Sequence, residues 1–191
     1  MNAKKIAVAS AAAILTAATA VASSAAAAPS ASATPSVSAR THKGKAQLMV
    51  WEVNSDGPFM RAQLTGAAGD YGHAVTIDRH GKVDSGNPSE LKLKLAHGSF
   101  RLSIVSIEKA FAKALRHWSP NPATCSGGII VTAPAPVIAH SGTGAYRGIT
   151  GTFSFTDNSS EVLPRSNCND TGGARPLSEL IVVDGTGAIS Y

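Results

Sequence analysis

One stretch of the sequence has the residue spacing of a binding loop: SGTGAYRGITGTFSF, at positions 141–155. It contains four closely spaced glycines, Gly142, Gly144, Gly148 and Gly151. A dinucleotide-binding loop requires the pattern G-x-G-x-x-G between a strand and a helix, but Arg147 stands at the position of the third glycine and strand-like residues follow. The Gly-Lys-Ser/Thr of a P-loop is absent as well. The spacing therefore argues against a phosphate-binding loop.

A mechanical role explains the same glycines better. Gly142 and Gly144 are expected to provide the positive φ angles of a tight turn, because glycine adopts them without steric cost. Gly148 and Gly151 are expected to lie in a strand and to permit a bulge or a sharp bend. The stretch predicts a bent chain packed by its aromatic residues.

Other candidates for chemistry are sparse. His73, Asp78 and His80 are close in sequence, but only the last two share a strand face, and a metal site needs three or more converging ligands. Ser126 in TCSGGI lacks the preceding Asp and the nucleophile elbow of a serine hydrolase. We therefore predict no metal and no other cofactor, and no catalytic residue can be assigned.

The N-terminus reads as a secretory signal peptide over residues 1–28. Lys4 and Lys5 precede the small-residue apolar run IAVASAAAILTAATAVA, and Ala-x-Ala cleavage options lie between Ala25 and Ala33. The run is mostly alanine and has no basic stop-transfer flank, so no membrane span is predicted. We expect a secreted, extracellular protein, with association to the cell wall as a further option.

Residues 29–45 are rich in Ala, Ser and Pro and poor in bulky apolar side chains, which predicts a disordered leader. Residues 46–191 then form the folded body, whose length suits one domain. Five of the 17 basic residues precede the first acidic residue, Glu52, so the body carries 12 charges of each sign. Because the body lacks a basic surface with interleaved aromatic residues, we predict no binding of nucleic acid.

The sequence contains two cysteines, Cys125 and Cys168. Oxidising conditions outside the cell favour a disulfide between them. Neither belongs to a CxxC pair with histidine partners at zinc-type spacing, so a metal role is disfavoured.

Strand-length segments separated by Gly, Pro and Asn turns dominate the body. The clearest period-two pattern places Leu91, Leu93 and Leu95 opposite Lys92 and Lys94. The expected strands lie within 46–53, 59–66, 73–81, 89–98, 99–106, 127–133, 136–140, 145–156 and 177–191. Together they predict an all-β fold, an antiparallel eight-stranded barrel or sandwich.

Two details interrupt this pattern. Residues 107–118 have apolar side chains at spacings of three and four, which predicts a short amphipathic helix across a barrel mouth or a sheet edge. Asp184-Gly185 between two apolar runs is typical of a tight hairpin.

The segment GTGAYRGITGTFSFT (142–156) resembles the Gly-Thr-Gly-x-Tyr/Phe-x-Gly-x-x-Gly segment of the barrel superfamily that contains allene oxide cyclases and dirigent proteins, and of many secreted bacterial proteins that share it. The barrels of that superfamily hold apolar ligands, which they cyclise or orient for radical coupling. The resemblance therefore implies an apolar interior pocket. The catalytic acidic, Asn, Cys or Arg positions of the family have no counterpart that can be assigned here.

Three hypotheses of function remain. The first is a secreted barrel that binds a small apolar ligand or an extracellular partner, with Trp51, Trp118 and Tyr146 as candidate ligand contacts. The alternatives are a cyclase or isomerase of the allene oxide cyclase type, and an extracellular interaction protein without a cavity. An open apolar interior would favour ligand binding, and a buried ionisable group within it would favour the enzyme. A filled interior would favour the interaction protein. The pattern assigns no oligomeric state.

Overall fold

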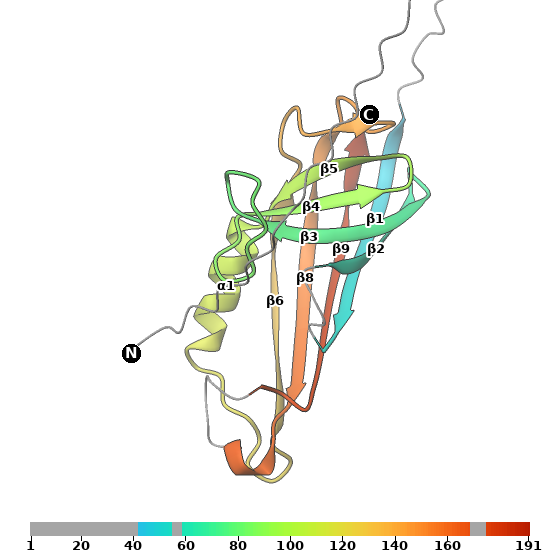
Figure 1. Cartoon of the computed structure of the whole chain (residues 1–191). Coiled ribbons are helices and arrows are strands. Elements are labelled where there is room, and N and C mark those ends of the chain that lie inside the picture. The colour runs from blue at the N-terminus through green and yellow to red at the C-terminus, as the bar shows by residue number, and fades with distance from the viewer. Residues whose placement is uncertain (1–41, 55–58, 169–174) are drawn as a thin grey trace, which may run out of the picture. The chain divides into compact units, whose positions relative to one another are not determined.

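The computed structural model describes residues 42–54, 59–168 and 175–191, which form one antiparallel sheet and one α-helix (Figure 1). The predicted signal peptide (1–28) and most of the predicted leader (29–45) lie outside the described residues. The strands are β1 (Lys43–Val53), β2 (Met60–Gly66), β3 (Asp70–Ile77), β4 (Glu90–Leu95), β5 (Gly98–Ser103), β6 (Ser126–Pro136), β7 (Thr143–Gly144), β8 (Thr150–Val162) and β9 (Ser178–Ser190). The helix is α1 (Val105–Leu115), and a short 3-10 turn, η1, covers Arg165–Asn167.

The sheet has the strand order β6-β8-β9-β1-β2-β3-β4-β5-β7, and every pair is antiparallel. β1 to β5 follow one another as a meander, whereas β9 returns to pair with both β1 and β8. The all-β prediction is confirmed. The described residues contain nine strands rather than eight, one of them the two-residue β7 at the edge of β5. The expected strand at 136–140 is wrong, since β6 ends at Pro136 and Val137 forms only an isolated bridge. The sheet is not closed.

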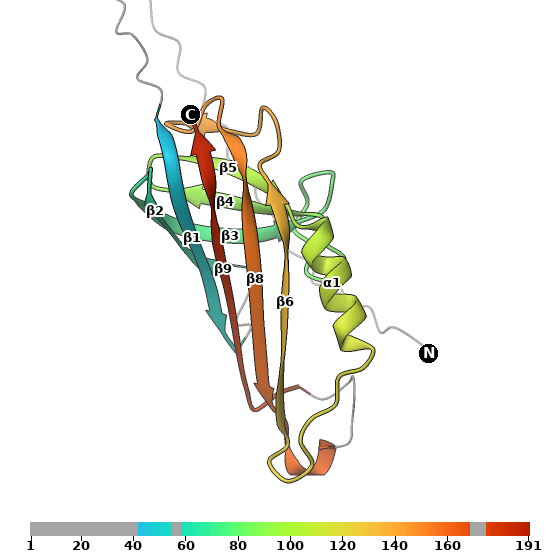
Figure 2. The ribbon, with the colours of Figure 1, turned by 180° about the vertical axis from the view of Figure 1, so that it is seen from behind.

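The strands fall into two groups of different length. β1, β6, β8 and β9 have 11 to 13 residues, whereas β2 to β5 have six to eight. At a rise of about 3.3 Å per residue, the long strands extend for about 36–43 Å and the short ones for about 20–26 Å. Figures 1 and 2 show β3, β4 and β5 crossing the long strands. The short strands therefore cover only part of the long ones.

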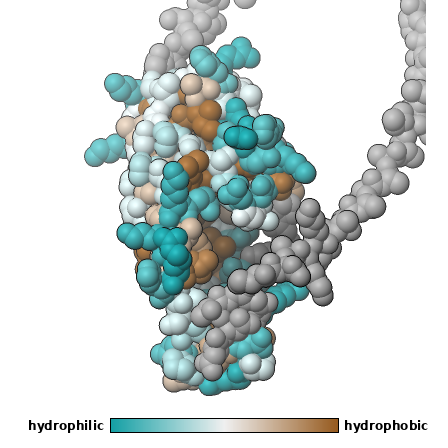
Figure 3. Space-filling model, turned by 90° about the vertical axis from the view of Figure 1, so that its left-hand side faces the viewer, coloured by the Kyte–Doolittle hydropathy of each residue, from teal (hydrophilic) through white to brown (hydrophobic). Residues whose placement is uncertain are grey.

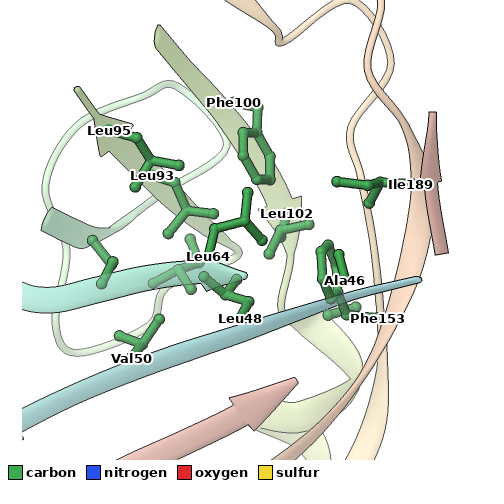
Figure 4. Packing of buried hydrophobic residues seen from close by; sticks show 14 of the residues in the cluster. Ala46, Leu48, Val50, Leu64, Leu93, Leu95, Phe100, Leu102, Phe153 and Ile189 are labelled. Carbon is green, nitrogen blue, oxygen red and sulfur yellow. The ribbon is translucent and has the colours of Figure 1, made fainter. Parts of the chain in front are cut away.

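The core lies where the two groups face each other (Figure 4). The predicted alternation in β4 is confirmed, since Leu91, Leu93 and Leu95 are buried. Phe100 and Leu102 of the neighbouring strand β5 are fully buried as well. The core also includes Leu48, Val50, Leu64, Phe153 and Ile189. Burial of this apolar surface is the main stabilising contribution to the fold.

The predicted hairpin at Asp184-Gly185 is wrong, because β9 runs through both residues without a turn. Gly185 pairs with Phe155 of β8, and a Cβ added at Gly185 would overlap the ring of Phe155. The glycine therefore provides room for an aromatic ring on the neighbouring strand, a close approach that is another common reason for glycine inside a strand.

The glycine-rich segment forms the turns that precede β8. Gly144, Gly148 and Gly151 have φ angles of 58°, 81° and 140°. Two expectations need correction: Gly148 lies in the turn rather than in a strand, and Gly142 does not have a positive φ. Gly142 is instead constrained by a close approach, since a Cβ there would overlap the carbonyl oxygen of Tyr146.

A buried carboxylate, Asp70, holds this segment against the sheet. Its side chain accepts hydrogen bonds from the Tyr146 hydroxyl at 2.7 Å and from the backbone N–H groups of Tyr71, Ala96 and His97 at 2.8–3.2 Å. Burial opposes ionisation of Asp70, but the hydrogen bonds from Tyr146, Tyr71 and His97 outweigh it and lower its pKa. One carboxylate thus joins the start of β3, the β4–β5 turn and the loop before β8.

The chain ends of the fold differ slightly from expectation. β1 begins at Lys43, so residues 43–45, which were expected to belong to the disordered leader, pair with β9. The apolar pattern that marks the core starts only at Ala46, whereas backbone pairing continues beyond it. The helix begins at Val105 and ends at Leu115 rather than spanning 107–118, and it packs against the edge strand β6 (Figure 2).

The predicted disulfide is confirmed. Cys125 immediately precedes β6 and is joined to Cys168, which follows η1 and lies 43 residues further along the chain. In the loop-entropy description, such a link stabilises the fold by about 4 kcal/mol, because it restricts the unfolded chain. The bridge fixes the connection that follows β8 to the start of its neighbouring strand β6.

We predict that Tyr146→Phe lowers the free energy of unfolding by about 1.5–3 kcal/mol, because the buried Asp70 carboxylate loses its hydroxyl donor. Because the pKa of Asp70 is lowered in the folded state, its ionisation stabilises the fold at pH values above the ordinary aspartate pKa. This stability is lost as the pH falls from that ordinary pKa through the lowered one. The difference between variant and wild type should therefore shrink under acid conditions. Urea unfolding at about pH 7 and about pH 2.5 measures it.

The matched control is Tyr71→Phe, which removes a hydroxyl from a tyrosine that is 71% exposed. It should change stability by less than about 0.5 kcal/mol. Equal losses in the two variants would show that the hydrogen bond to Asp70 does not hold the segment.

Candidate functional site

A cavity of about 540 Å³ lies between α1, the long strands and the ends of β3 and β4. Its walls are mostly apolar and come from β1, β2, β4, β8, β9, α1 and Ile104, the residue before α1. The apolar lining consists of Val50, Met60, Leu91, Ile104, Ile107, Phe111, Phe155, Ile181 and Val183. Figure 3 looks at the side of the molecule that carries α1 and shows hydrophobic surface between hydrophilic areas. The core is therefore closed at one end of the sheet and open at the other.

The opening follows from a change along the inward face of β8. Successive inward residues of a strand are two apart, and on β8 they change from Phe153 and Phe155 to Asp157, Ser159 and Glu161. The two phenylalanines are fully buried, whereas the three polar residues are partly exposed. Phe155 is the last apolar residue on this face and lines the cavity, and the polar residues after it face the two hollows beside α1.

Carboxyl groups supply the charge in the cavity. Glu52, Glu108, Asp157 and Glu179 line it from β1, α1, β8 and β9. Within the described structure, the lining includes no Lys, Arg or His. The polar groups of the cavity are therefore acidic, apart from the Thr76, Ser85 and Ser159 hydroxyls.

Two of these carboxyls hold their protons more strongly than usual. Burial raises the pKa of Asp157, although the Ser159 hydroxyl, which donates to Asp157 Oδ1 at 2.8 Å, opposes the increase. Burial also raises the pKa of Glu108, and the negative charge of Asp157 raises it further. Carboxyls with raised pKa values keep their protons to a higher pH than exposed ones, and they can exchange a proton with a ligand or pair with a cation.

A second hollow, of about 210 Å³, lies on the other side of Phe111, between α1 and the β6–β8 pair. Trp118 lines it, and the indole lies so close to Gly127 that an added Cβ would be 3.0 Å from Trp118 Nε1. Phe111, Ser159 and Glu179 line both hollows. The two spaces are therefore neighbours and share one lining residue each from α1, β8 and β9.

The structure does not bring the three predicted ligand contacts together. Trp118 lines the second hollow, whereas Tyr146 is 2% exposed and its hydroxyl is bound to Asp70. Trp51 lies between two residues that face the cavity, Val50 and Glu52, so its side chain points to the opposite face of β1. The bend glycines likewise do not line either hollow.

The polar residues singled out in the sequence form local contacts instead. Asp78 accepts hydrogen bonds from the backbone N–H groups of His80 and Lys82 in the turn after β3, and His73 lies 3.4 Å from Arg61. Across the described residues, no group of three or more His, Cys, Asp or Glu side chains is placed to hold a metal ion. The same residues include no helix with the length and apolarity needed to cross a membrane.

Sequence reasoning missed the cavity carboxyls, although a signal for them exists. In TGTFSFTDNSSEV the period-two face that carries Phe153 and Phe155 continues through Asp157 and Glu161. A strand that extends beyond Thr156 places acidic groups on its core-facing side, where charged side chains are uncommon.

We predict that Glu108→Gln raises the free energy of unfolding at about pH 7, by on the order of 1 kcal/mol after allowance for solvent screening. The reason is that the raised pKa of Glu108 makes its charged form unfavourable in the folded state. The folded protein holds this proton more tightly, so wild-type stability falls as the pH rises from the ordinary glutamate pKa through the raised one. The gain should therefore vanish at about pH 3, as urea unfolding at both pH values would show.

Asp184→Asn is the control, since Asp184 follows Val183 on β9 and points to the outer face, where it accepts a hydrogen bond from Gln47. This variant removes the same charge outside the cavity and should give no gain. A Glu108→Gln protein that is less stable than wild type at about pH 7 would contradict the electrostatic account of the cavity.

No protein-family model, curated protein or solved structure matches the chain.

Proposed function

We propose that this protein binds a small, mainly apolar ligand in the cavity beside α1. The observation that carries the proposal is the space itself, about 540 Å³ lined mostly by aliphatic and aromatic side chains with a few polar groups. Ligand pockets typically enclose about 300–1,000 Å³ and have this kind of lining. The walls come from strands of the antiparallel sheet and from α1.

We also propose that the sheet is an incompletely closed barrel of the allene oxide cyclase and dirigent kind. Its two ends approach each other at one place, where Leu102 of β5 forms an antiparallel bridge with Val137 after β6, and the Ile138 N–H donates to the Arg101 carbonyl at 2.9 Å. No ladder of strand pairing joins β5 to β6 among the described residues, and α1, which follows β5 in the chain, packs against β6. The glycine-rich segment 142–156 supports the same assignment, and barrels of that superfamily hold apolar ligands.

A cyclase or isomerase activity is the second candidate. It is favoured by one observation, the pair of cavity carboxyls, Asp157 and Glu108, whose pKa values burial raises. Such groups suit proton transfer to and from a bound substrate. The enzyme hypothesis is supported if the wild-type protein converts a bound compound while the Asp157→Asn variant binds the same compound and releases it unchanged. If both proteins release the compound unchanged, only the binding function is supported.

The third hypothesis, an interaction protein without a cavity, is disfavoured because the interior is filled only at the end near Tyr146. We place the protein outside the cell. The basic, apolar and small-residue order of residues 1–28 and the Cys125–Cys168 disulfide support export.

We predict that Val183→Phe weakens binding of an apolar probe by about tenfold or more, because the added ring occupies the cavity that Val183 lines. N-phenyl-1-naphthylamine is a suitable probe, since it is uncharged and its fluorescence rises in apolar surroundings. Titration of wild-type and variant protein gives both affinities.

Val182→Phe is the matched control. Val182 precedes Val183 on β9 and points to the outer face, where it pairs with Trp51. The same increase in volume there should leave probe affinity within about twofold of wild type, and thermal unfolding verifies that both variants fold. Equal affinities for all three proteins, or no binding by wild type, would overturn the proposed site.

A further inference from the structure

We propose that the ligand of this cavity is an amphiphilic cation, with its positive group between Glu108 of α1 and Asp157 of β8 and its apolar part against the aromatic and aliphatic wall. This inference rests on the proposed function, because it names the chemical class of ligand for the same cavity. The two walls present carboxyl groups among apolar side chains, and the described lining contains no Lys, Arg or His.

The two carboxyls come from opposite walls. Glu108 is preceded by Ile107 on α1 and lies one turn from Phe111, and all three side chains line the cavity. Asp157 lies between Phe155 and Ser159 on the inward face of β8. Each acidic group is therefore set in an apolar wall, and the space between the walls is the cavity.

The described residues that line the cavity include no cation to balance the charge of Glu108 and Asp157. Arg79, His80 and Lys109 line a separate hollow that Glu108 also borders. Among the described elements packed around the two carboxyls, β1 adds Glu52 and β9 adds Glu179, and the lining residues from β2, β3 and β4 are Met60, Thr76 and Leu91. The Glu108 carboxylate makes no hydrogen bond or ion pair with the described residues, and Asp157 receives one hydrogen bond, from Ser159. A bound cation would satisfy both groups at once.

The electrostatics favour a cation over other ligands. A positive charge placed between two partly buried carboxylates gains more than in water, because the surroundings screen it less. An anion would be repelled, and an uncharged ligand would leave the carboxylates in unfavourable, poorly solvated positions. Burial raises the pKa of both carboxyls, which means that their negative charge is less stable in the cavity than in water. A bound cation would stabilise that charge.

The apolar walls determine the remainder of the ligand. Phe111, Phe155 and Ile181 lie beside the carboxyls and can enclose an alkyl or aromatic group. The faces of the two phenylalanines also attract organic cations. A simple metal ion would leave these walls exposed to water, so an ammonium group attached to an apolar body fits the cavity better.

The test compares three probes of equal chain length by isothermal titration at about pH 7.5 and low salt. They are octylammonium, octan-1-ol and octanoate. We expect wild-type protein to bind octylammonium about tenfold or more tightly than octan-1-ol, and octanoate most weakly. Glu108→Gln and Asp157→Asn should each remove most of this preference, whereas Asp184→Asn on the outer face should retain it.

The outcomes separate this inference from the function on which it rests. Equal binding of the three probes, with no effect of Glu108→Gln or Asp157→Asn, would overturn the cation preference and leave apolar binding intact. Binding of none of them, together with no binding of N-phenyl-1-naphthylamine, would overturn the cavity as a site. Lowering the pH provides a second readout, since protonation of the two carboxyls should weaken octylammonium binding and leave that of octan-1-ol unchanged.

Discussion

The two halves of the sheet have strands of very different length, and this difference leaves part of the interior without a cover of strands. β8 and β9 each have 13 residues, while β4 and β5, which cross them, each have six. The short strands can bury only the part of the long strands that carries Phe153 and Phe155. The remaining length needs another cover, which α1 provides from the side of β6. A helix packed beside a sheet edge fills this space less completely than strands would, and the cavity is what remains.

Two kinds of carboxylate follow from this division. Asp70 lies in the closed part, where the Tyr146 hydroxyl and backbone N–H groups surround it, and its pKa is lowered despite burial. Glu108 and Asp157 lie in the open part with few donors, and burial raises their pKa values. A fully hydrogen-bonded carboxylate fixes loops, whereas a carboxylate short of partners favours a bound ligand or proton. The contrast separates a fully hydrogen-bonded acidic group from two that have few partners.

Much of the architecture could be predicted from the sequence, because period-two patterns report burial directly. The Leu91, Leu93 and Leu95 face, the all-β class and the Cys125–Cys168 bridge depend on local pattern or on simple chemistry. The continuity of β9 through Asp184-Gly185 could not be predicted in this way. The glycine there is required by the ring of Phe155, a residue distant in sequence, and its local signal is the same as that of a tight turn.

The site was harder to predict than the fold. Aromatic residues were the natural candidates for ligand contacts, yet Tyr146 belongs to the core and Trp51 to the outer face. The side on which a residue lies depends on the register of a whole strand, and its place inside a cavity depends on where the facing strands end. Where the facing strands end is a property of the assembled sheet and cannot be read from a single strand. The proximity of Glu108 and Asp157 therefore becomes visible only when α1 is placed in the folded structure.

If part of the interior is an open apolar cavity beside α1, a crystal structure determined under xenon pressure should show xenon in it. Xenon enters apolar cavities without requiring a particular shape or charge. We expect xenon beside Phe111, Phe155 and Ile181, with the core around Phe100 and Leu102 unoccupied. Absence of xenon at that position, with α1 packed directly onto the inward face of β8, would show that the cavity does not exist.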